Sequence, residues 1–369
     1  MNKSASIVNL ASSVAVASVR TARVCVALAV LAVLLPHEAF GQKPTEPPEP
    51  QSTVNATYVE PSSTTPIKPG DKVKHLFRRN MNQPYILQRL TKRTYWAQHQ
   101  HYAALFYVGA KGVLLFDAPA GAGDAVIKAV AEVTKLPITA VVMSHDHADH
   151  IGDTHVIVDN AAKTRTKLRI IASQATADKM VLLKSGHPKP TETVAWPHGS
   201  FEFEGLTVEL HGFVHAAHTD DHAAWLLRGE KIVHLPDLIH PDHAPFWGWA
   251  AAENFVYFES NLDELGKLEW DYLSAGHGNI GSRADLALYK TYIADMKQAL
   301  GKAMSEVKFG ETVDMTKANA ATVLLTSYLA KVGRLATETL RPKYGRSYGF
   351  DESTQRNAEM VALAMFSYR

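Results

Sequence analysis

Cysteine is almost absent from this sequence: the 369 residues include one, Cys25, close to the N-terminus. A single cysteine cannot form a disulfide bond within its own chain. It also lies in a segment that we expect to be removed from the mature protein, as argued below. Thiolate ligands are then excluded as well, so a metal site has to be built from histidine and carboxylate side chains.

An excess of charge of either sign is also missing. The chain has 38 basic and 37 acidic side chains, which gives a formal net charge of +1. Proteins that hold nucleic acid by bulk electrostatics carry a marked excess of basic residues. We therefore expect no nucleic-acid partner, and a small molecule as the substrate. No pattern in the sequence indicates an oligomeric state.

The apolar run near the N-terminus is short. It reads VCVALAVLAVLL over residues 24–35, whereas a membrane-spanning helix needs about 20 residues. Two arginines precede it, and the small residues Ala39 and Gly41 follow it. This order is typical of a secretory signal peptide. We predict a cleaved signal over residues 1–41, a periplasmic or secreted protein, and no membrane span after processing; the alternative is an uncleaved membrane anchor.

Composition and periodicity divide the rest of the chain into three parts. Residues 42–72 are rich in Pro, Ser, Thr and Glu, which predicts a disordered linker. Residues 73–300 contain alternating strand and helix patterns, and residues 301–369 continue as helix, which predicts a helical extension packed on a folded domain. The expected strands and helices cover 102–109, 111–119, 121–135 (helix), 138–144, 168–173, 201–213 (hairpin), 223–237 (two strands) and the helical region from 282.

The stretch VVMSHDHADHIGD, residues 141–153, crowds titratable groups behind an apolar run. It contains His145, Asp146, His147, Asp149 and His150. Burying such groups without partners costs several kcal/mol each, and a bound metal ion would compensate them. In an extended loop, residues i and i+2 share a face, so the first two histidines can turn toward one point. Imidazole and carboxylate ligands favour zinc.

Further candidate ligands follow at strand ends. HAAHTDDH offers His215, His218 and His222, and spacing alone leaves open which of the three binds. Asp237 ends the strand pattern IVHLPD, and His277 stands between two glycines that allow a close approach of the backbone. We predict one ion held by His145, His147 and His218, a second held by Asp149, His150 and His277, and Asp237 as the bridge.

These residues, in this order, resemble the metallo-β-lactamase-fold hydrolases, over about residues 102–297. The resemblance implies an α/β fold, an αβ/βα four-layer sandwich, as the catalytic domain, with two Zn²⁺ per chain at the sheet edges. Asp117 matches the strand-terminal Asp that supports the metal loop in this family. Two departures concern loop shape: Ala217 and Pro236 stand where the family often has glycine.

The implied mechanism uses a metal-bridging hydroxide that attacks the substrate. Asp149 and Asp237 are its predicted catalytic carboxylates, and Asp117 and Asp146 are predicted to fix the imidazole tautomers. The FWGW stretch is predicted either to form an apolar wall over the site, with Phe246, Trp247 and Trp249, or to pack into the core. The other histidines are expected to be ordinary surface or core residues: His99, His101, His155, His187, His198, His211, His234, His240 and His243.

Two subgroups of this family can be distinguished from this chain by single residues. The absence of cysteine after the signal excludes β-lactamases with a cysteine in the second zinc site, and His147 stands where di-iron relatives carry glutamate. The sequence therefore favours an exported zinc-dependent hydrolase of a small apolar ester or lactone. The alternatives are hydrolysis of a β-lactam, a phosphotriester or a halogenated aromatic compound, or a non-enzymatic metal-binding protein with the same fold.

Overall fold

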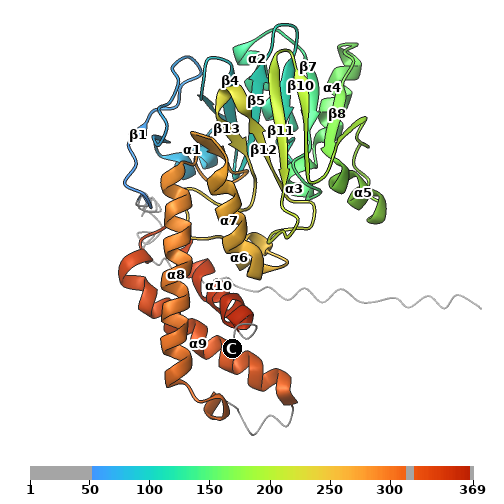
Figure 1. Ribbon diagram of the computed structural model, residues 1–369. Coiled ribbons are helices and arrows are strands. Elements are labelled where there is room, and N and C mark those ends of the chain that lie inside the picture. Colours follow the sequence, from blue (N-terminus) through green and yellow to red (C-terminus); the bar gives the residue numbers. More distant parts are fainter. Residues whose placement is uncertain (1–51, 313–319, 366–369) are drawn as a thin grey trace, which may run out of the picture. The chain divides into compact units, whose positions relative to one another are not determined.

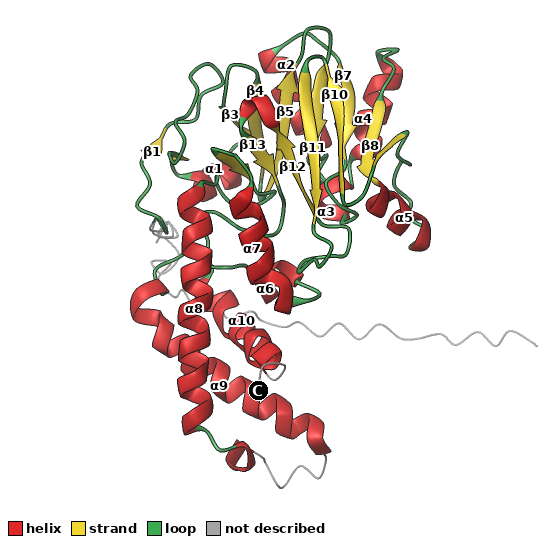
Figure 2. Ribbon diagram, viewed as in Figure 1, coloured by secondary structure: helices red, strands yellow, loops and turns green. Residues whose placement is uncertain are grey.

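Two β-sheets form the centre of the molecule (Figures 1 and 2). The structure is a computed structural model that describes residues 52–312 and 320–365. The predicted signal peptide, residues 1–41, and the first part of the predicted linker lie outside the described residues. The expected elements from 102 onward appear with shifts of a few residues at their ends.

The larger sheet has seven strands, and it runs antiparallel from β3 to β6 and parallel from β6 to β9. In sheet order its strands are β3 Ile86–Arg89, β4 Thr94–His99, β5 Tyr102–Val108, β6 Val113–Phe116, β7 Ile138–Val142, β8 Arg169–Ser173 and β9 Glu192–Val194. The parallel strands need crossover segments. Helices α2 Gly123–Val133, α3 Ala148–Ile151, α4 Thr154–Lys163 and α5 Gln174–Leu182 lie in these crossovers.

The smaller sheet has five strands and ends in a parallel pair. Its strands are β10 His198–Phe203, β11 Leu206–Gly212, β12 Ala223–Leu227, β13 Ile232–His234 and β14 Tyr272–Ser274. Because β13 and β14 run in the same direction, their carboxyl ends meet at one edge of the sheet. The segments that follow these two strands therefore emerge side by side.

Alternating side chains bury both faces of each sheet. On β5, Leu105 and Tyr107 belong to the core shared by the two sheets, with Trp225 of β12. Ala104 and Phe106 belong to a second core, which includes residues of α2 and α4. The core on the outer face of the five-stranded sheet includes residues of helices α7 Phe258–Lys267 and α8 Arg283–Glu306, and it continues through helices α6 Gly248–Ala251, α9 Ala320–Tyr344 and α10 Phe350–Met365, of which α9 and α10 pack on α8. This helix–sheet–sheet–helix order is the predicted four-layer sandwich with a helical C-terminal region.

The C-terminal helices continue the core instead of extending away from it. Val332 of α9 and Val361 of α10 are fully buried in the same cluster as Leu273 of β14. Short 3₁₀ helices η1 Arg228–Glu230, η2 Phe255–Tyr257 and η3 Phe309–Thr312 lie in connecting segments. None of the helices in the described part of the chain is long and apolar enough to cross a membrane.

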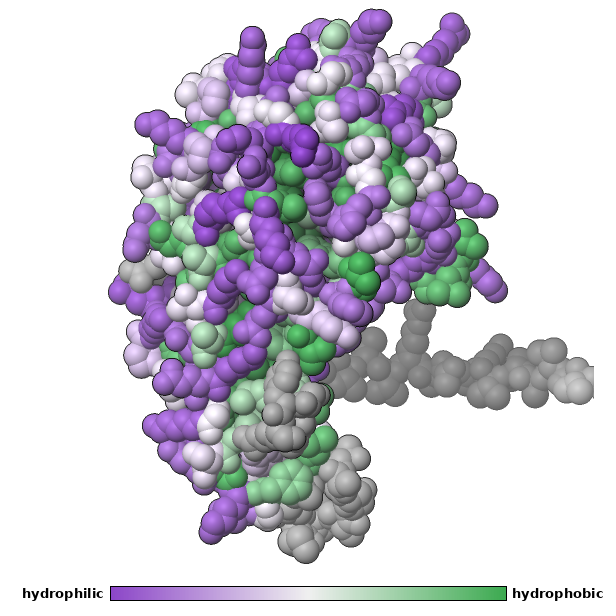
Figure 3. All heavy atoms as spheres, viewed as in Figure 1, coloured by the Kyte–Doolittle hydropathy of each residue, from purple (hydrophilic) through white to green (hydrophobic). Residues whose placement is uncertain are grey.

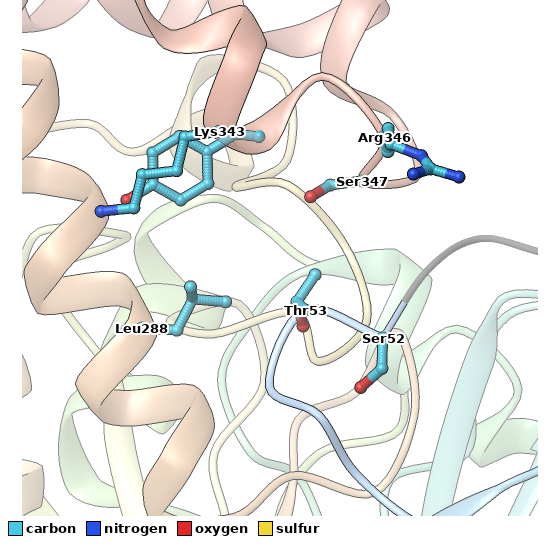
Figure 4. A pocket seen from close by; sticks show the side chains of 7 residues that line it. Ser52, Thr53, Leu288, Lys343, Arg346 and Ser347 are labelled. Carbon is cyan, nitrogen blue, oxygen red and sulfur yellow. The ribbon is translucent and has the colours of Figure 1, made fainter.

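Residues 52–73, here called the N-terminal strap, depart from the predicted disordered linker. β1 Tyr58–Val59 pairs with β2 Lys72–Val73, and helix α1 Leu76–Asn82 follows. Ile67 is buried in the core between the sheets, and its carbonyl accepts a hydrogen bond of 2.7 Å from the Tyr272 hydroxyl. A few buried contacts place a segment whose composition alone predicts disorder. At its start the strap lines a pocket of about 180 Å³ with the end of α9, where Lys343 is found (Figure 4).

Candidate metal centre

The candidate ligands lie on loops at one edge of the two sheets. The loop after β7 carries His145 and His147, and α3 within it carries Asp149 and His150. The loop before β12 carries His218. Asp237 and His277 follow β13 and β14, whose carboxyl ends meet at the same edge. Residues up to 132 positions apart (145 to 277) are thereby brought together by the sheet topology.

The first ligand group consists of His145, His147, His218 and Asp237. Its ligand atoms lie within 4.8 Å of one another. His218 Nε2 is 3.3 Å from His145 Nε2 and 3.0 Å from His147 Nδ1. Burial lowers the pKa of His145 well below its ordinary value and that of His147 to about 4. Neutral imidazoles whose nitrogens converge on one point are what a metal ion requires.

The second group consists of Asp149, His150, Asp237 and His277. His150 Nε2 lies 3.4 Å from Asp149 Oδ2, and His277 Nε2 lies at the same distance from that oxygen. Burial alone would lower the pKa of His277, but Asp237 and Asp149 raise it to about 10. The His277 Nδ1–H donates to the carbonyl oxygen of His101 at 3.0 Å, which directs Nε2 toward the carboxylates.

Asp237 belongs to both groups. Its Oδ2 lies 2.8 Å from His150 Nε2 and 3.3 Å from His218 Nε2, while its Oδ1 lies 3.2 Å from His277 Nε2. Burial alone would raise the pKa of Asp237, but the surrounding imidazoles, with His150 first among them, lower it well below its ordinary value. The residue has a φ of +65°, a left-handed conformation that Asp tolerates better than most residues. A carboxylate between two ligand groups is suited to bridging two ions.

The donors fit zinc on the chemistry of the site itself. Each group offers four nitrogen or oxygen ligands, the number and type that Zn²⁺ prefers. Both ring nitrogens of the fully buried His150 lack a hydrogen-bond partner among the described residues, although Nε2 approaches a carboxylate oxygen. Buried polar nitrogens without partners are costly, and a cation between His150 and the carboxylates would remove that cost.

Asp117 contacts the loop that carries His145 and His150. Its Oδ1 accepts a hydrogen bond of 2.8 Å from the Ser144 backbone N–H, and its Oδ2 lies 3.8 Å from His150 Nδ1. The same Oδ2 accepts from His234 Nε2 at 2.8 Å, and His234 Nδ1 accepts from the Ser274 hydroxyl at 3.0 Å. His234, expected to be an ordinary histidine, is thus a core histidine that holds this carboxylate in place.

Asp146 does not hold an imidazole, contrary to the prediction. Its side chain turns toward α5 and lies 3.2 Å from Lys179 Nζ. Its backbone N–H donates to Asp221 Oδ2 at 2.8 Å. Burial and the neighbouring Asp221 raise the pKa of Asp146 to about 6, while Lys179 opposes the rise. The side chain alternates away from those of His145 and His147, since residues i and i+1 in an extended loop face opposite sides.

Among the three histidines that the spacing leaves open, the structure brings His218 into the site. The Nε2–H of His222 donates to the Pro236 carbonyl at 2.6 Å. His215 stacks on Tyr257 with 4.9 Å between ring centroids. Neither His215 nor His222 belongs to a ligand group. A ring engaged by a backbone carbonyl or an aromatic face is turned away from the centre.

Two residues of the site were missed by the reasoning from sequence. His240, expected to be ordinary, is buried, and its Nε2–H donates to Asp237 Oδ1 at 3.3 Å. Ser144, which directly precedes the first ligand, has its hydroxyl 3.0 Å from His145 Nδ1. The sequence feature that could have indicated a role for His240 is its position three residues after Asp237, in a loop rich in histidine and proline. Ser144 gave no signal beyond its place next to a ligand.

The predicted aromatic wall is only partly present. The Phe246 ring is parallel to that of His277 at 6.4 Å and is 47% exposed, beside the second ligand group. Trp247 is exposed and lies under the guanidinium of Arg356. Trp249 is buried in the core, where its indole N–H donates to the Asn357 carbonyl at 3.2 Å. The wall interpretation is therefore wrong for Trp249, because a large apolar ring with a polar partner inside the core is better satisfied there.

Gly276 shows why small neighbours surround His277. Its φ is +76°, and a Cβ atom at this position would lie 2.6 Å from Cε1 of His150. Real Cβ contacts are never this close, so a side chain here would displace the imidazole. The glycine lets the backbone of one ligand loop pass directly against a ligand of another.

Part of the sequence matches a known protein family. Residues 98–277, just under half of the chain, match the metallo-beta-lactamase superfamily. Among solved structures, the metallo-beta-lactamase from Pontibacter korlensis is 17% identical with a TM-score of 0.47, and the match covers 55% of this chain and 95% of that chain. The DIM-1 metallo-beta-lactamase is 14% identical with a TM-score of 0.47, over 57% of this chain and 96% of that chain. Among curated proteins, none has a sequence detectably similar to this one.

Proposed function

We propose that this protein is a zinc-dependent hydrolase with two ions per chain, acting on a small, neutral, apolar ester or lactone. The position of Asp237 carries the proposal. Its Oδ2 lies between the two groups, 3.3 Å from His218 Nε2 and 2.8 Å from His150 Nε2, and its Oδ1 lies 3.2 Å from His277 Nε2 of the second group. Two ions that share a carboxylate lie close enough to act on one substrate bond.

The metal would supply a Lewis acid and a water acidified to a pKa near 7. The chain's own residues divide the remaining work. The Asp149 side chain is 40% exposed, whereas that of Asp237 is 5% exposed, so Asp149 is the carboxylate that incoming water and substrate can reach. Asp149 can accept a proton at Oδ1, since its Oδ2 is turned toward His150 and His277. His240 fixes the orientation of Asp237 through Oδ1.

The substrate class is proposed from the side chains around the open side of the second group. Phe246 offers an exposed apolar face parallel to His277. Tyr102 lies on the neighbouring strand end, with its ring centroid 5.1 Å from that of His277. The chain as a whole is nearly neutral, with a formal net charge of +1. Apolar flanks beside a few polar groups are typical of sites for small organic molecules, and they favour an ester or lactone over a polyanion.

The test combines metal analysis with a substrate panel. Purified protein is analysed for metal and then assayed on aryl esters, lactones, phosphotriesters and β-lactams before and after chelation. We expect two zinc ions per chain and turnover of an ester or lactone that chelation abolishes and zinc restores. One ion or fewer after zinc addition contradicts the dinuclear site. A β-lactam or phosphotriester as the preferred substrate keeps the metal centre but overturns the substrate class.

We also propose export, on the basis of the basic flank, apolar run and small residues within residues 1–41. The mature protein should begin near Gln42 and appear in the periplasm or the medium. N-terminal sequencing of the protein from its natural host tests this. Retention of residues 1–35 would indicate a membrane anchor instead.

A further inference from the structure

A lysine lies between the two loops that carry the first ligand group. Lys179 is on α5, and its side chain is 14% exposed. Its Nζ lies 3.2 Å from Asp146 Oδ1, 2.8 Å from Asp220 Oδ1 and 3.4 Å from Asp221 Oδ1, and it also donates to the Thr219 hydroxyl. Asp146 stands between two histidine ligands in the first loop, while Thr219 directly follows the ligand of the second loop. One ammonium group therefore links both loops.

The last turn of this helix exposes two apolar residues next to the inward-turned lysine. Val181 and Leu182 of α5 are 73% and 77% exposed, while Lys179 turns inward. Figure 3 shows apolar side chains gathered on the surface over α5. A helix on a protein surface ordinarily buries its apolar side chains and exposes its lysines. The inward position of Lys179 is therefore explained by its contacts with the three carboxylates.

A second lysine makes comparable contacts with carboxylates near the loops of the second ligand group. Lys72 of the N-terminal strap is fully buried, and its Nζ lies 3.0 Å from Asp285 Oδ1 and 3.8 Å from Asp242 Oδ1. The same Asp242 accepts hydrogen bonds from the Tyr58 hydroxyl at 3.0 Å and from Asn279 Nδ2 at 2.9 Å. These contacts join the strap to the loops after β13 and β14.

Those two loops carry the ligands on which the second group depends. Asp242 lies five residues after Asp237, and Asn279 lies two residues after His277. The Asn279 backbone N–H also donates to the Pro241 carbonyl at 3.1 Å. The Lys72 cluster therefore fixes the spacing between the carboxylate bridge and the imidazole of the second group, as the Lys179 cluster fixes the spacing between the imidazoles of the first.

We propose that Lys179 and Lys72 are positioning residues for the metal centre, each serving one ligand group. Lys179 holds the His145–His147 loop against the His218 loop, and Lys72 holds the Asp237 loop against the His277 loop. Removing either ammonium leaves two or three carboxylates facing one another, and buried carboxylates without a counter-charge repel and draw in water. The loops then separate, and the ion that they share loses its geometry. This inference rests on the metal centre of the proposed function.

The experiment measures metal affinity instead of turnover. Zn²⁺ and Co²⁺ are titrated into metal-free wild type, Lys179→Met and Lys72→Met, and the Co²⁺ absorption spectrum reports the two coordination environments. His218→Ala and His277→Ala provide reference spectra for loss of the first and the second ion. We expect Lys179→Met to weaken the ion that His218→Ala removes by about 10- to 100-fold, as for other supports of metal ligands. Lys72→Met should weaken the other ion by a similar factor.

Matched variants separate positioning from general damage. Lys179→Arg keeps the charge and several donors, so it should recover most of the affinity. Lys163→Met removes an exposed lysine at the end of α4 and should bind metal like wild type. If Lys72→Met fails to fold, Tyr58→Phe removes one hydrogen bond to Asp242 and should weaken the second ion alone. If the wild-type protein binds no metal, the proposed function is wrong. If the two lysine variants bind metal as tightly as wild type, or if each variant loses both ions equally, the proposed roles of the lysines are wrong.

Discussion

Asp237 is the residue on which the geometry of the centre depends most. It supplies an oxygen to each ligand group, and it is nearly fully buried. We expect Asp237→Ala to lower zinc affinity and turnover by at least about 10- to 100-fold, because a bridging ligand matters more than the supports to which that range applies. Zinc titration with a chromogenic chelator measures the loss. The fold should survive, since the neighbouring strand β13 is buried in the core through Ile232 and Val233.

His222→Ala is the matched control for this prediction. His222 is fully buried close to the first ligand group, with its ring centroid 5.0 Å from that of His218, but its Nε2–H is engaged by the Pro236 carbonyl. The variant should keep most of its zinc. Two ions and full turnover in Asp237→Ala would contradict the bridging role. An empty site in His222→Ala beside a filled site in His218→Ala would show that the third histidine has been misassigned.

Gly276→Ala tests a steric contact at the second ion. The new methyl group would meet Cε1 of His150 at 2.6 Å, so the imidazole has to move. Gly121→Ala is the control, because Gly121 has a nearly equal φ of +75° and nothing within 4 Å of its Cβ position. Both changes carry the left-handed backbone penalty of about 1 to 2 kcal/mol. Only Gly276→Ala should lose the second ion in a Co²⁺ titration; equal metal binding by the two variants would rule out the contact.

Single residues of the site were predictable where local spacing carries the information. The HxHxDH pattern places four ligand side chains within one loop, and any fold that exposes the loop brings them together. Lys179 could not be found this way, because its partners lie on two loops far away in the sequence. His240 lies only three residues after its partner Asp237, but spacing does not show which way its ring turns. Asp146 was misplaced for the same reason: the contact that decides its orientation is made with α5.

At the scale of elements, the N-terminal strap offers a test of packing. Ile67 is 4% exposed in the core between the sheets, and truncation of a buried isoleucine to alanine costs about 2 to 5 kcal/mol. Urea unfolding of Ile67→Ala should show a loss in that range. Lys68→Ala, one residue further on and exposed, should change little. Equal stability of the two variants would indicate that the strap does not pack on the domain.

The elements themselves were predicted best where apolar periodicity is strong. α2 and the strands from β5 to β8 follow patterns that bury one or both faces, and their ends moved by only a few residues. The strap was missed because proline, serine and threonine dominate its composition, while its placement depends on Ile67, Lys72 and a short strand pair. Composition averages over a segment, whereas a few buried contacts can determine its position.

At the scale of the whole molecule, metal binding and folding should be linked. The ligands come from loops on both sheets, so a chain that unfolds loses both sites at once. A ligand that binds only the folded state stabilises it by about 2.7 kcal/mol when present at 100 times its Kd. Calorimetry should therefore show a melting temperature that rises with zinc concentration and falls with a chelator. A melting temperature that is the same in both would contradict a site shared between the sheets.

The ion pair between Lys72 and Asp285 also constrains the order in which contacts of the fold can form during synthesis. The two residues are 213 positions apart in the chain, so at 5 to 20 residues per second a ribosome takes roughly 10 to 40 s to make the second after the first. During this interval the Lys72 end of the strap lacks its later partners, because the loop of Asn279 and the start of α8 do not yet exist. The ligand His277 emerges in the same late stretch. The contacts of Lys72 and Val73 therefore form among the last, and the second metal site can be completed only after most of the domain has been synthesised.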